Sequence, residues 1–259
     1  MDGDNVLDNA TLMSLKVYAS DLERAARLKM QNLYESCPIP ADQRLSNLGL
    51  FLESKQLSRL LFMDFLYRQV IDVQGVVMEF GTHWGQNTAV FTALRGIYDS
   101  FNRHRKIVGF DTFKGFPSVT PEDGSSELMQ IGKLKTTEGY PNYLRQLLQT
   151  HQDLNPLSHI NKNEICVGDA SVELEKYLAR EPHTIVSLAY FDFDLYEPTK
   201  KCLELIRTRV VKGSVIGFDE LNDPDSPGET LALMEVMGLS NIRLKRYRYA
   251  SRVSYYVVE

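Results

Sequence analysis

The chain has 259 residues, of which 43% are hydrophobic and 24% are charged. This composition is that of an ordinary globular protein, and it excludes a disordered, collagen-like or coiled-coil chain. The formal net charge of −5 argues against nucleic acid or an acidic membrane surface as the main partner. The length suits one large domain, or a domain with an added helical segment.

The sequence carries no recognisable targeting signal. Its first residues, MDGDNVLDNATL, are acidic and polar and contain no apolar signal-peptide core. No run approaches the roughly 18 apolar residues of a membrane span. The cysteines Cys37, Cys166 and Cys202 are odd in number and have no metal-like spacing, which indicates free thiols. We therefore expect a cytoplasmic protein that contacts neither membrane nor nucleic acid.

The first third of the chain has helical patterns. Over residues 9–36, apolar positions recur mostly at helical spacing, and Pro38 and Pro40 end this pattern. A stronger amphipathic helix is expected over 54–72, where apolar residues recur three and four positions apart. We expect residues 1–72 to form a helical cap or oligomerisation segment. Simple packing against a sheet is the alternative.

From residue 75 onward, expected strands alternate with expected helices. Strands are expected at 75–80, 106–111, 164–169, 185–192 and 214–219, and helices at 87–98, 142–151, 171–179 and 198–209. This alternation predicts a parallel sheet with helices on both faces. Two β-rich runs near the C-terminus, 241–248 and 253–259, have no helix between them and predict an antiparallel hairpin that completes the sheet.

The predicted fold class is therefore α/β, a Rossmann-like mixed sheet with a parallel core, a C-terminal antiparallel hairpin and an N-terminal helical segment. A mixed sheet of this kind is more typical of class I methyltransferases than of NAD-binding domains. Residues 73–259 are expected to form the ligand-binding domain. The long polar connection at about 112–140 is expected to be a functional lid, because long connections in compact domains are usually functional.

Acidic side chains stand at the ends of the five expected strands. They are Glu79, Asp111, Asp169, Asp192 and the pair Asp219–Glu220. Ligands of open α/β sheets bind at the carboxyl ends of the strands, so these residues predict a polar crevice. For any single one of them, a solvated loop carboxylate is the alternative.

The loop after the first strand helps to distinguish between cofactors. A dinucleotide fingerprint would read G-x-G-x-x-G, with an acidic residue about 20 positions later. Here only Gly81 and Gly85 are present, and Glu79 precedes them. A carboxylate in this position disfavours a pyrophosphate and favours an ammonium or sulfonium group. The loop thus favours S-adenosylmethionine over NAD, and a purely structural turn is the alternative.

Three motifs in order resemble the macrocin O-methyltransferase (TylF-like) family over about residues 50–225. They are Glu79-Phe-Gly81-Thr-His-Trp-Gly85-Gln-Asn-Thr88, Gly109-Phe-Asp111-Thr-Phe-Lys-Gly115-Phe-Pro117 and Asp192-Phe-Asp194-Leu-Tyr-Glu-Pro-Thr199. The second is similar to the family's D-S-F-E-G-L-P, and the third to its D-G-D-x-Y-E-S-T. That family methylates sugar hydroxyls of antibiotics and related natural products. The resemblance implies an S-adenosylmethionine-dependent O-methyltransferase that acts on a glycosylated small molecule and releases S-adenosylhomocysteine.

The resemblance also assigns the cofactor contacts. The first loop would lie under the methionine part of the cofactor, and Asp111 would accept hydrogen bonds from both ribose hydroxyls. Asp169 would contact adenine, cap the helix that starts near Ser171, or do both. The expected cofactor-binding residues are Glu79, Gly81, Thr82, Gly85, Asn87, Thr88, Asp111, Thr112, Asp169 and Ala170.

Family members of this kind use a divalent cation to hold the sugar hydroxyls. Asp192 matches the first Asp of the family's D-x-D and is expected to be a metal ligand and the general base. Asp219 and Glu220 fall where the family has a D-D pair, although Phe218-Asp219-Glu220 departs from that pattern. Three carboxylates without a Cys or His cluster favour Mg²⁺. Strand alternation is expected to turn Asp194 away from Asp192.

The acceptor and the assembly state depend on weaker signals. Phe116, Tyr140 and Tyr196 are candidates for stacking on the acceptor, with core packing as the alternative. His83 is expected to pack against or line the cofactor site. The resemblance implies a homo-oligomer.

Three alternative functions remain open. They are a metal-dependent O-methyltransferase of phenolic or catechol-like acceptors, a nicotinamide-dependent oxidoreductase and a non-catalytic binding module.

Overall fold

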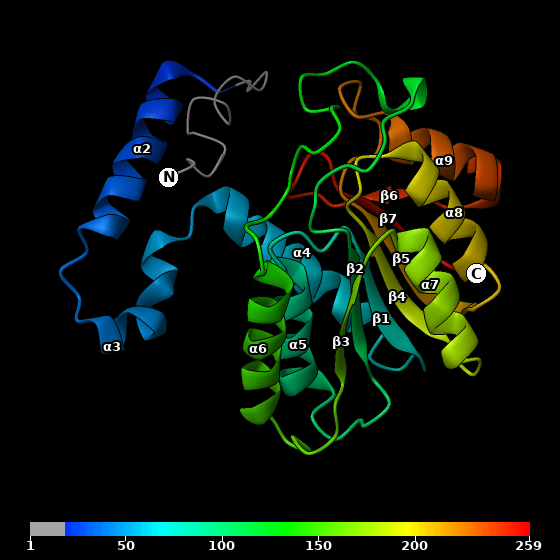
Figure 1. Ribbon diagram of the computed structural model, residues 1–259, viewed down its shortest axis with the longest axis horizontal. Helices are drawn as coiled ribbons and strands as arrows, with labels where there is room; N and C mark the ends of the chain where they lie inside the picture. The colour runs from blue at the N-terminus through cyan, green and yellow to red at the C-terminus, as the bar shows by residue number, and fades with distance from the viewer. Residues whose placement is uncertain (1–18) are drawn as a thin grey trace. The chain divides into compact units, whose positions relative to one another are not determined.

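The computed structural model describes residues 19–259 (Figure 1), so the beginning of the helix expected at 9–36 lies outside the described residues. The chain divides into two compact units between Arg59 and Leu60. This division falls inside helix α4 (Ser54–Gln69), which matches the helix expected at 54–72. The domain boundary expected at residue 72, just beyond the end of α4, stays a prediction.

The described part of the N-terminal unit is helical. Helix α2 (Asp21–Glu35) begins with a capping box: the Ser20 hydroxyl accepts the Glu23 backbone N–H, and the Glu23 carboxylate accepts the Ser20 backbone N–H at 2.7 Å. Helix α3 (Ala41–Arg44) and the 3-10 helix η1 (Leu45–Phe51) follow. None of these three elements has a buried side chain, so their apolar residues are at least partly exposed.

The second unit is built on one mixed sheet (Figure 1). Its strands are β1 (Val76–Phe80), β2 (Ile107–Asp111), β3 (Asn163–Val167), β4 (Val186–Phe191), β5 (Val210–Phe218), β6 (Lys245–Arg246) and β7 (Ser254–Val257). Their spatial order is β3-β2-β1-β4-β5-β7-β6. Strands β1 to β5 pair in parallel, whereas β7 pairs antiparallel with β5 and β6. The predicted parallel core and C-terminal hairpin are confirmed.

Helices cover both faces of this sheet (Figure 1). They are α5 (Gln86–Tyr98), α6 (Tyr140–Asp153), α7 (Ala170–Arg180), α8 (Tyr196–Ile206) and α9 (Gly228–Met237), with short 3-10 turns η2 (Pro121–Asp123) and η3 (Leu239–Asn241). The sequence pattern does not predict α9. Its residues 231–234 are all apolar, so the helix lacks the amphipathic periodicity that reveals the others.

Alternation along the strands divides the core between the two faces. Val76, Met78 and Phe80 of β1 pack in the same cluster as residues of α7, α8 and α9, whereas Val77 packs with residues of α4 and α5. This is the two-residue period of a strand buried on both sides. Each fully buried large apolar side chain stabilises the fold by about 1.5–3 kcal/mol, so both helix layers hold the sheet in place.

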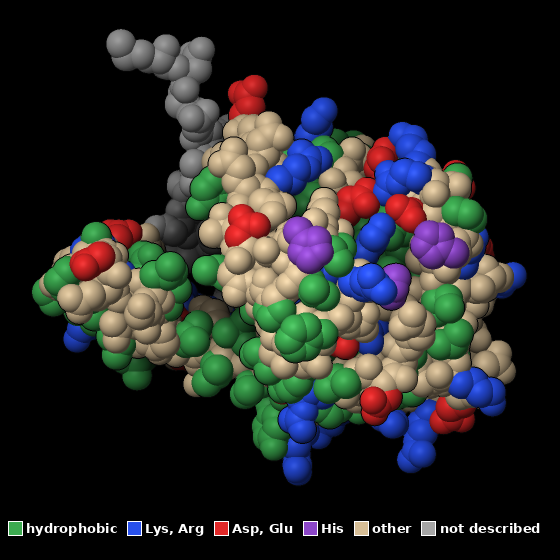
Figure 2. All heavy atoms as spheres, turned by 90° about the horizontal axis from the view of Figure 1, so that it is seen from below, with side chains coloured by type: hydrophobic (Ala, Val, Ile, Leu, Met, Phe, Trp, Pro, Cys, Tyr) green, Lys and Arg blue, Asp and Glu red, His purple; other side chains and the backbone are tan. Residues whose placement is uncertain are grey.

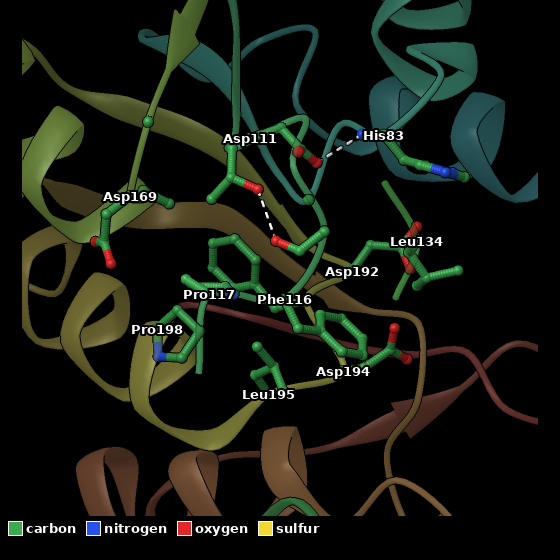
Figure 3. A pocket seen from close by; sticks show the side chains of 16 residues that line it. His83, Asp111, Phe116, Pro117, Leu134, Asp169, Asp192, Asp194, Leu195 and Pro198 are labelled. Atoms are coloured by element: carbon green, nitrogen blue, oxygen red, sulfur yellow. Dashed lines mark hydrogen bonds between the residues drawn. The ribbon is translucent and has the colours of Figure 1, made fainter. Parts of the chain in front are cut away.

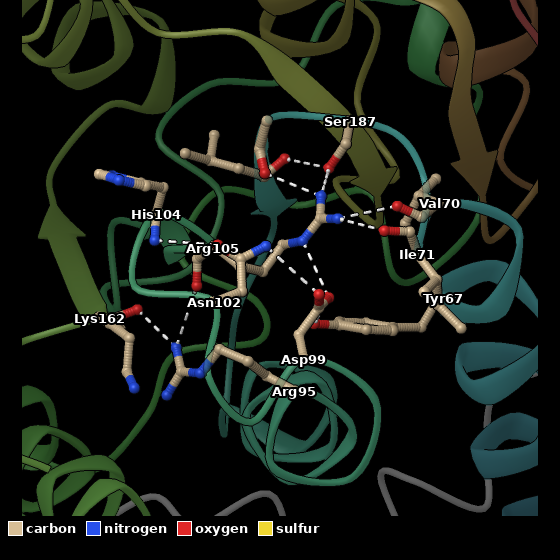
Figure 4. Close-up of polar contacts among 12 residues, drawn as sticks. Tyr67, Val70, Ile71, Arg95, Asp99, Asn102, His104, Arg105, Lys162 and Ser187 are labelled. Carbon is tan, nitrogen blue, oxygen red and sulfur yellow. Dashed lines mark hydrogen bonds and ion pairs between the residues drawn. The ribbon is translucent and has the colours of Figure 1, made fainter. Parts of the chain in front are cut away.

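A buried arginine connects the helical layer to the amino ends of the strands (Figure 4). The Arg105 side chain is 1% exposed and forms an ion pair with Asp99 at 3.1 Å. Its guanidinium also donates to the carbonyl oxygens of Val70 and Gly75, each at 2.8 Å. Asp99 in turn accepts the hydroxyl of Tyr67 at 2.9 Å. Five donors on a planar group suit Arg for this position, because it joins several backbone segments at once.

The surface of the molecule is mixed in charge. On the face shown in Figure 2, Lys and Arg side chains are interspersed with Asp and Glu, and hydrophobic side chains lie between them. Within residues 19–259, no helix is both long enough and apolar enough to cross a membrane. The cysteines Cys37, Cys166 and Cys202 are free and buried.

Candidate active site

A cavity opens at the carboxyl ends of strands β1 to β4 (Figure 3). This is the edge at which open α/β sheets bind ligands. The predicted site residues that line it are Gly81, Asp111, Thr112, Phe116, Asp169, Ala170 and Asp192. The remaining lining residues are His83, Gly115, Pro117, Leu134, Gly168, Phe193, Asp194, Leu195 and Pro198.

Gly81 brings the first loop close to the end of β4. Its φ of +89° is a conformation that residues with a side chain rarely adopt. A Cβ at this position would also collide with the carbonyl oxygen of Asp192. Glycine is therefore required twice over, once for the turn and once for the close backbone approach.

Asp111 is fixed at the end of β2 by two backbone donors. Its carboxylate accepts the N–H of His83 at 2.7 Å (Figure 3) and the N–H of Phe113 at 2.5 Å. Burial raises the pKa of Asp111, and these two hydrogen bonds partly oppose the rise. Burial likewise lowers the pKa of His83, which favours the neutral imidazole. The carboxylate is thus preorganised to accept hydrogen bonds from a ligand in the cavity.

Asp169 both caps a helix and lines the cavity. Its Oδ1 accepts the backbone N–H groups of Ser171 at 3.0 Å and Val172 at 3.3 Å at the start of α7. Burial acts to raise its pKa, but the hydrogen bonds from Ser171 and Val172 outweigh that effect and lower it. The helix-cap alternative is confirmed, and it holds together with a position in the cavity wall.

Asp192 and Asp194 both line the cavity. The prediction that strand alternation turns Asp194 away from Asp192 has a wrong premise, because β4 ends at Phe191 and Asp194 has a positive φ of 61°. The chain has left the extended strand conformation before it reaches Asp194. Figure 3 draws both side chains among the residues that line the cavity. The D-x-D motif therefore directs both of its acids to one site.

Several predicted cofactor residues do not line the cavity. Glu79 is 1% exposed, and its carboxylate accepts the hydroxyl of Thr88 in the first turn of α5. Gly85, with φ +79°, leaves room for Leu144 of α6. Thr82 and Asn87 are buried. None of these residues lines the cavity, and direct contact with the cofactor stays a prediction for each of them.

The acids after β5 are held by other side chains. Asp219 accepts the hydroxyl of Tyr190 at 2.7 Å. Glu220 is 5% exposed and pairs with Arg252, which also reaches Asp223 at 2.9 Å. Over residues 19–259, no three or more His, Cys, Asp or Glu side chains are grouped so that they could hold a metal ion. The structure therefore does not assemble Asp192, Asp219 and Glu220 into one ligand set.

Of the three aromatic candidates, Phe116 lines the cavity and two do not. The Tyr140 hydroxyl donates to the carbonyl oxygen of Trp84 at 2.8 Å, next to an edge-to-face contact between the two rings. The Tyr196 hydroxyl donates to Glu235. Leu195 and Pro198, which flank Tyr196 in the third motif, provide apolar wall instead. Their place inside that motif is the signal that could have identified them.

The structure of CalS11, a calicheamicin methyltransferase, is similar over nearly the whole chain. The identity is 40% and the TM-score 0.91, over 99% of this chain and 98% of that chain. Its apo structure, described as a TDP-rhamnose 3′-O-methyltransferase of calicheamicin biosynthesis, gives 39% and 0.82 over 93% and 96% of the two chains. The O-methyltransferase NovP, at 18% identity and a TM-score of 0.58 over 77% and 79%, shares the fold. No model of a known protein family and no curated protein matches the chain.

The mixed sheet, the glycine turn after β1 and the acids that line one cavity define an S-adenosylmethionine-dependent O-methyltransferase of class I. The three sequence motifs lie at the carboxyl ends of β1, β2 and β4. The chain belongs to the TylF-like sugar O-methyltransferases of antibiotic biosynthesis, the family of CalS11. The resemblance found in the sequence is confirmed, and the oxidoreductase and binding-module alternatives are not supported.

Proposed function

We propose that the protein methylates a hydroxyl of a sugar that belongs to a glycosylated natural product or to its nucleotide-linked precursor. The observation that carries this proposal is the 40% identity with CalS11 over 99% of the chain. CalS11 is described as acting on TDP-rhamnose at the 3′-hydroxyl. A nucleoside-diphosphate sugar is therefore the first acceptor class to test, with the complete glycosylated product as the second.

The residues of the cavity suit the proposed methyl donor. Asp111 would accept the ribose hydroxyls, because one carboxylate can accept two hydrogen bonds from a vicinal diol. Asp169 and Ala170 would border adenine, and the Gly81 turn would follow the methionine part. When bound, S-adenosylmethionine supplies an activated methyl group, whose transfer to oxygen forms an O–C bond and breaks the S–C bond.

The protein must align the acceptor hydroxyl and remove its proton. We propose that the carboxylate of Asp192 accepts this proton. Asp192 lines the cavity at the end of the central strand β4. A general base in this position typically contributes 10²–10⁴-fold to the rate. Alignment contributes further, because it converts the encounter of two reactants into a step within one complex.

Assistance by Mg²⁺ stays a prediction, and the carboxylates of the structure do not fit it. The hydroxyl of Tyr190 and the guanidinium of Arg252 already interact with two of the three expected ligands, Asp219 and Glu220. We therefore assign no step of the reaction to a metal. Loss of turnover in EDTA with recovery in Mg²⁺ would establish the metal, and unchanged turnover in EDTA would exclude metal assistance.

We further propose that the N-terminal unit forms a contact between copies of this chain. Its helices expose large apolar side chains: Leu22 is 79% exposed, Leu45 79% and Leu50 63%. Exposed apolar surface of this kind, on helices without buried side chains, marks interaction sites. Light scattering of the full chain and of a Leu22→Glu, Leu45→Glu variant tests this. We expect a homo-oligomer whose mass falls in the variant, and a monomeric wild type would contradict the proposal.

We propose a cytoplasmic location on the chemistry of the cysteines. All three are free and buried, and burial raises the pKa of the Cys166 thiol to about 12. Thiols with such a pKa are inert, as expected of structural cysteines in a reducing compartment.

The mixed surface charges and the net charge of −5 favour a small-molecule acceptor over nucleic acid.

The decisive experiment is isothermal titration with S-adenosylhomocysteine in Mg²⁺ and in EDTA, followed by turnover assays. We expect micromolar binding in both buffers, because the residues assigned to the cofactor are separate from Asp219 and Glu220. No binding in either buffer would overturn the cofactor assignment. Turnover with TDP-rhamnose or a glycosylated product would support the sugar acceptor, whereas turnover with catechols alone would replace it by the phenolic alternative.

A further inference from the structure

A carboxylate from the 112–140 connection, Asp123, caps helix α8, which also contributes to the cavity wall. Asp123 lies in η2 and is 1% exposed. Its Oδ2 accepts the backbone N–H of Thr120 at 2.6 Å and the hydroxyl of Thr120 at 3.1 Å, which closes its own turn. Its Oδ1 accepts the backbone N–H of Tyr196 at 2.5 Å. One carboxylate thus joins two segments that are 73 residues apart.

The bond to Tyr196 satisfies a helix end that lacks a cap of its own. Tyr196 is the first residue of α8, and the preceding Leu195 provides no side-chain cap. The first N–H groups of a helix have no partner within the helix and carry partial positive charge. A buried carboxylate is the strongest acceptor that the chain can place there, because it supplies both the hydrogen bond and the negative charge.

The two joined segments form much of the apolar wall of the cavity. Phe116, Pro117 and Leu134 come from the connection, and Leu195 and Pro198 come from the start of α8. Phe116 and Leu195 also pack together with Met129 in one small buried cluster. Displacement of the connection from α8 would therefore open the wall beside Asp192 and Asp194.

A third backbone segment, the start of α9, lies close to the contact between Asp123 and Tyr196. A Cβ on Gly228, the first residue of α9, would lie 2.6 Å from the Tyr196 nitrogen and 2.9 Å from Asp123 Oδ1. Real Cβ atoms do not approach other atoms so closely. The absence of a side chain at residue 228 is therefore part of the same arrangement, because it lets the start of α9 lie against Asp123 and Tyr196.

We propose that Asp123 is a positioning residue that fastens the 112–140 connection to the N-terminus of α8 and so holds the wall of the cofactor and acceptor cavity in place. The catalytic consequence rests on the proposed function, whereas the fastening itself does not. Because Asp123 does not line the cavity, it acts through Leu195 and the connection rather than by touching a ligand.

The test compares Asp123→Ala and Asp123→Asn with two matched controls. Glu122→Gln changes an exposed carboxylate in the same turn. Asp99→Asn changes a buried carboxylate that pairs with Arg105 and does not line the cavity. The readouts are the dissociation constant of S-adenosylhomocysteine, the rate of trypsin cleavage after Lys133 and Lys135 in the connection, and Tm.

We expect Asp123→Ala to weaken S-adenosylhomocysteine binding by roughly fivefold to tenfold, less than the full value of one charge-assisted hydrogen bond because Asp123 acts only through the wall, and to speed cleavage of the connection. Asp123→Asn should restore part of the binding and part of the resistance to cleavage. Its single carbonyl oxygen can accept from only one of the two partners, Thr120 and Tyr196. Glu122→Gln should match the wild type, and Asp99→Asn should lower Tm without weakening binding.

Unchanged binding and cleavage in Asp123→Ala would overturn the proposal. Equal weakening in Asp99→Asn would also overturn it, because the effect would then follow from general destabilisation. If Asp123→Ala does not fold, Asp123→Asn and Gly228→Ala apply the same test. Neither readout requires an acceptor, so a wild type that methylates no sugar refutes the proposed acceptor and leaves the positioning role to be judged by binding and cleavage.

Discussion

The carboxylate of Glu229 accepts the backbone N–H of Phe193 at 2.9 Å. Phe193 lies between Asp192 and Asp194, so this bond holds the segment that places both acids in the cavity. Glu229 is fully buried in the first turn of α9. Burial, followed by the negative charge of Asp194, raises its pKa to about 8. The helix that the sequence pattern does not reveal thus supports the segment of Asp192 and Asp194 with an acid whose pKa is raised by burial.

Glu229 is expected to make stability depend on pH. Its pKa of about 8 exceeds the ordinary 4.5, so its contribution to stability is complete below pH 4.5 and is lost as pH rises toward 8. In Glu229→Gln the neutral amide does not titrate, so Tm should fall less between pH 5 and pH 8 than in the wild type. Thermal unfolding at several pH values measures this, with Glu122→Gln as the control. Parallel curves for Glu229→Gln and wild type would contradict it.

Asp192→Asn should separate catalysis from cofactor binding. The amide cannot take a proton from the acceptor, so we expect kcat to fall by about 10²–10⁴-fold. The dissociation constant of S-adenosylhomocysteine should change by less than about threefold, because Asp111 and the Gly81 turn remain. Steady-state kinetics and calorimetry measure the two effects, with the exposed Asp72→Asn as control. A variant that keeps full turnover would remove Asp192 from the mechanism.

Gly81→Ala should damage both the fold and the cofactor site. The methyl group would collide with the carbonyl oxygen of Asp192, and φ at this residue is +89°. We expect a lower Tm and at least about tenfold weaker S-adenosylhomocysteine binding, since residues with a Cβ disfavour positive φ and the loop must move. Gly49→Ala is the matched control, because nothing lies within 4 Å of a Cβ there. Equal behaviour of the two variants would refute the close approach.

Arg105→Met should strongly destabilise the second unit. The substitution leaves the buried Asp99 without the Arg105 cation and removes one donor each from the carbonyl groups of Val70 and Gly75. Loss of one partner of a buried ion pair typically costs about 3–5 kcal/mol in the free energy of unfolding. Urea unfolding measures it. Arg68→Met, which removes an exposed ion pair with Asp64 at 3.9 Å, should have a much smaller effect. Similar losses of unfolding free energy in the two variants would show that the buried ion pair of Arg105 stabilises the fold no more than an exposed one.

The sequence by itself determined the alternation of strands and helices, the C-terminal hairpin and the acids at the strand ends. These features are local, because strand periodicity, glycine turns and an acid at a strand end depend on neighbouring residues. Parallel strands then bring their carboxyl ends to one edge, so Asp111, Asp169 and Asp192 meet at the cavity as predicted. The three motifs were sufficient to indicate the family.

Only the tertiary structure decided which of these acids face the cavity. Glu79 points to Thr88, Asp219 to Tyr190 and Glu220 to Arg252, and each pairing joins positions that no local pattern connects. Asp194 turns into the cavity because the chain leaves the strand at Phe191. Asp123 and Glu229 act across 73 and 36 residues. Such contacts depend on how separate elements pack, because a buried polar group accepts whatever donor the fold brings to it.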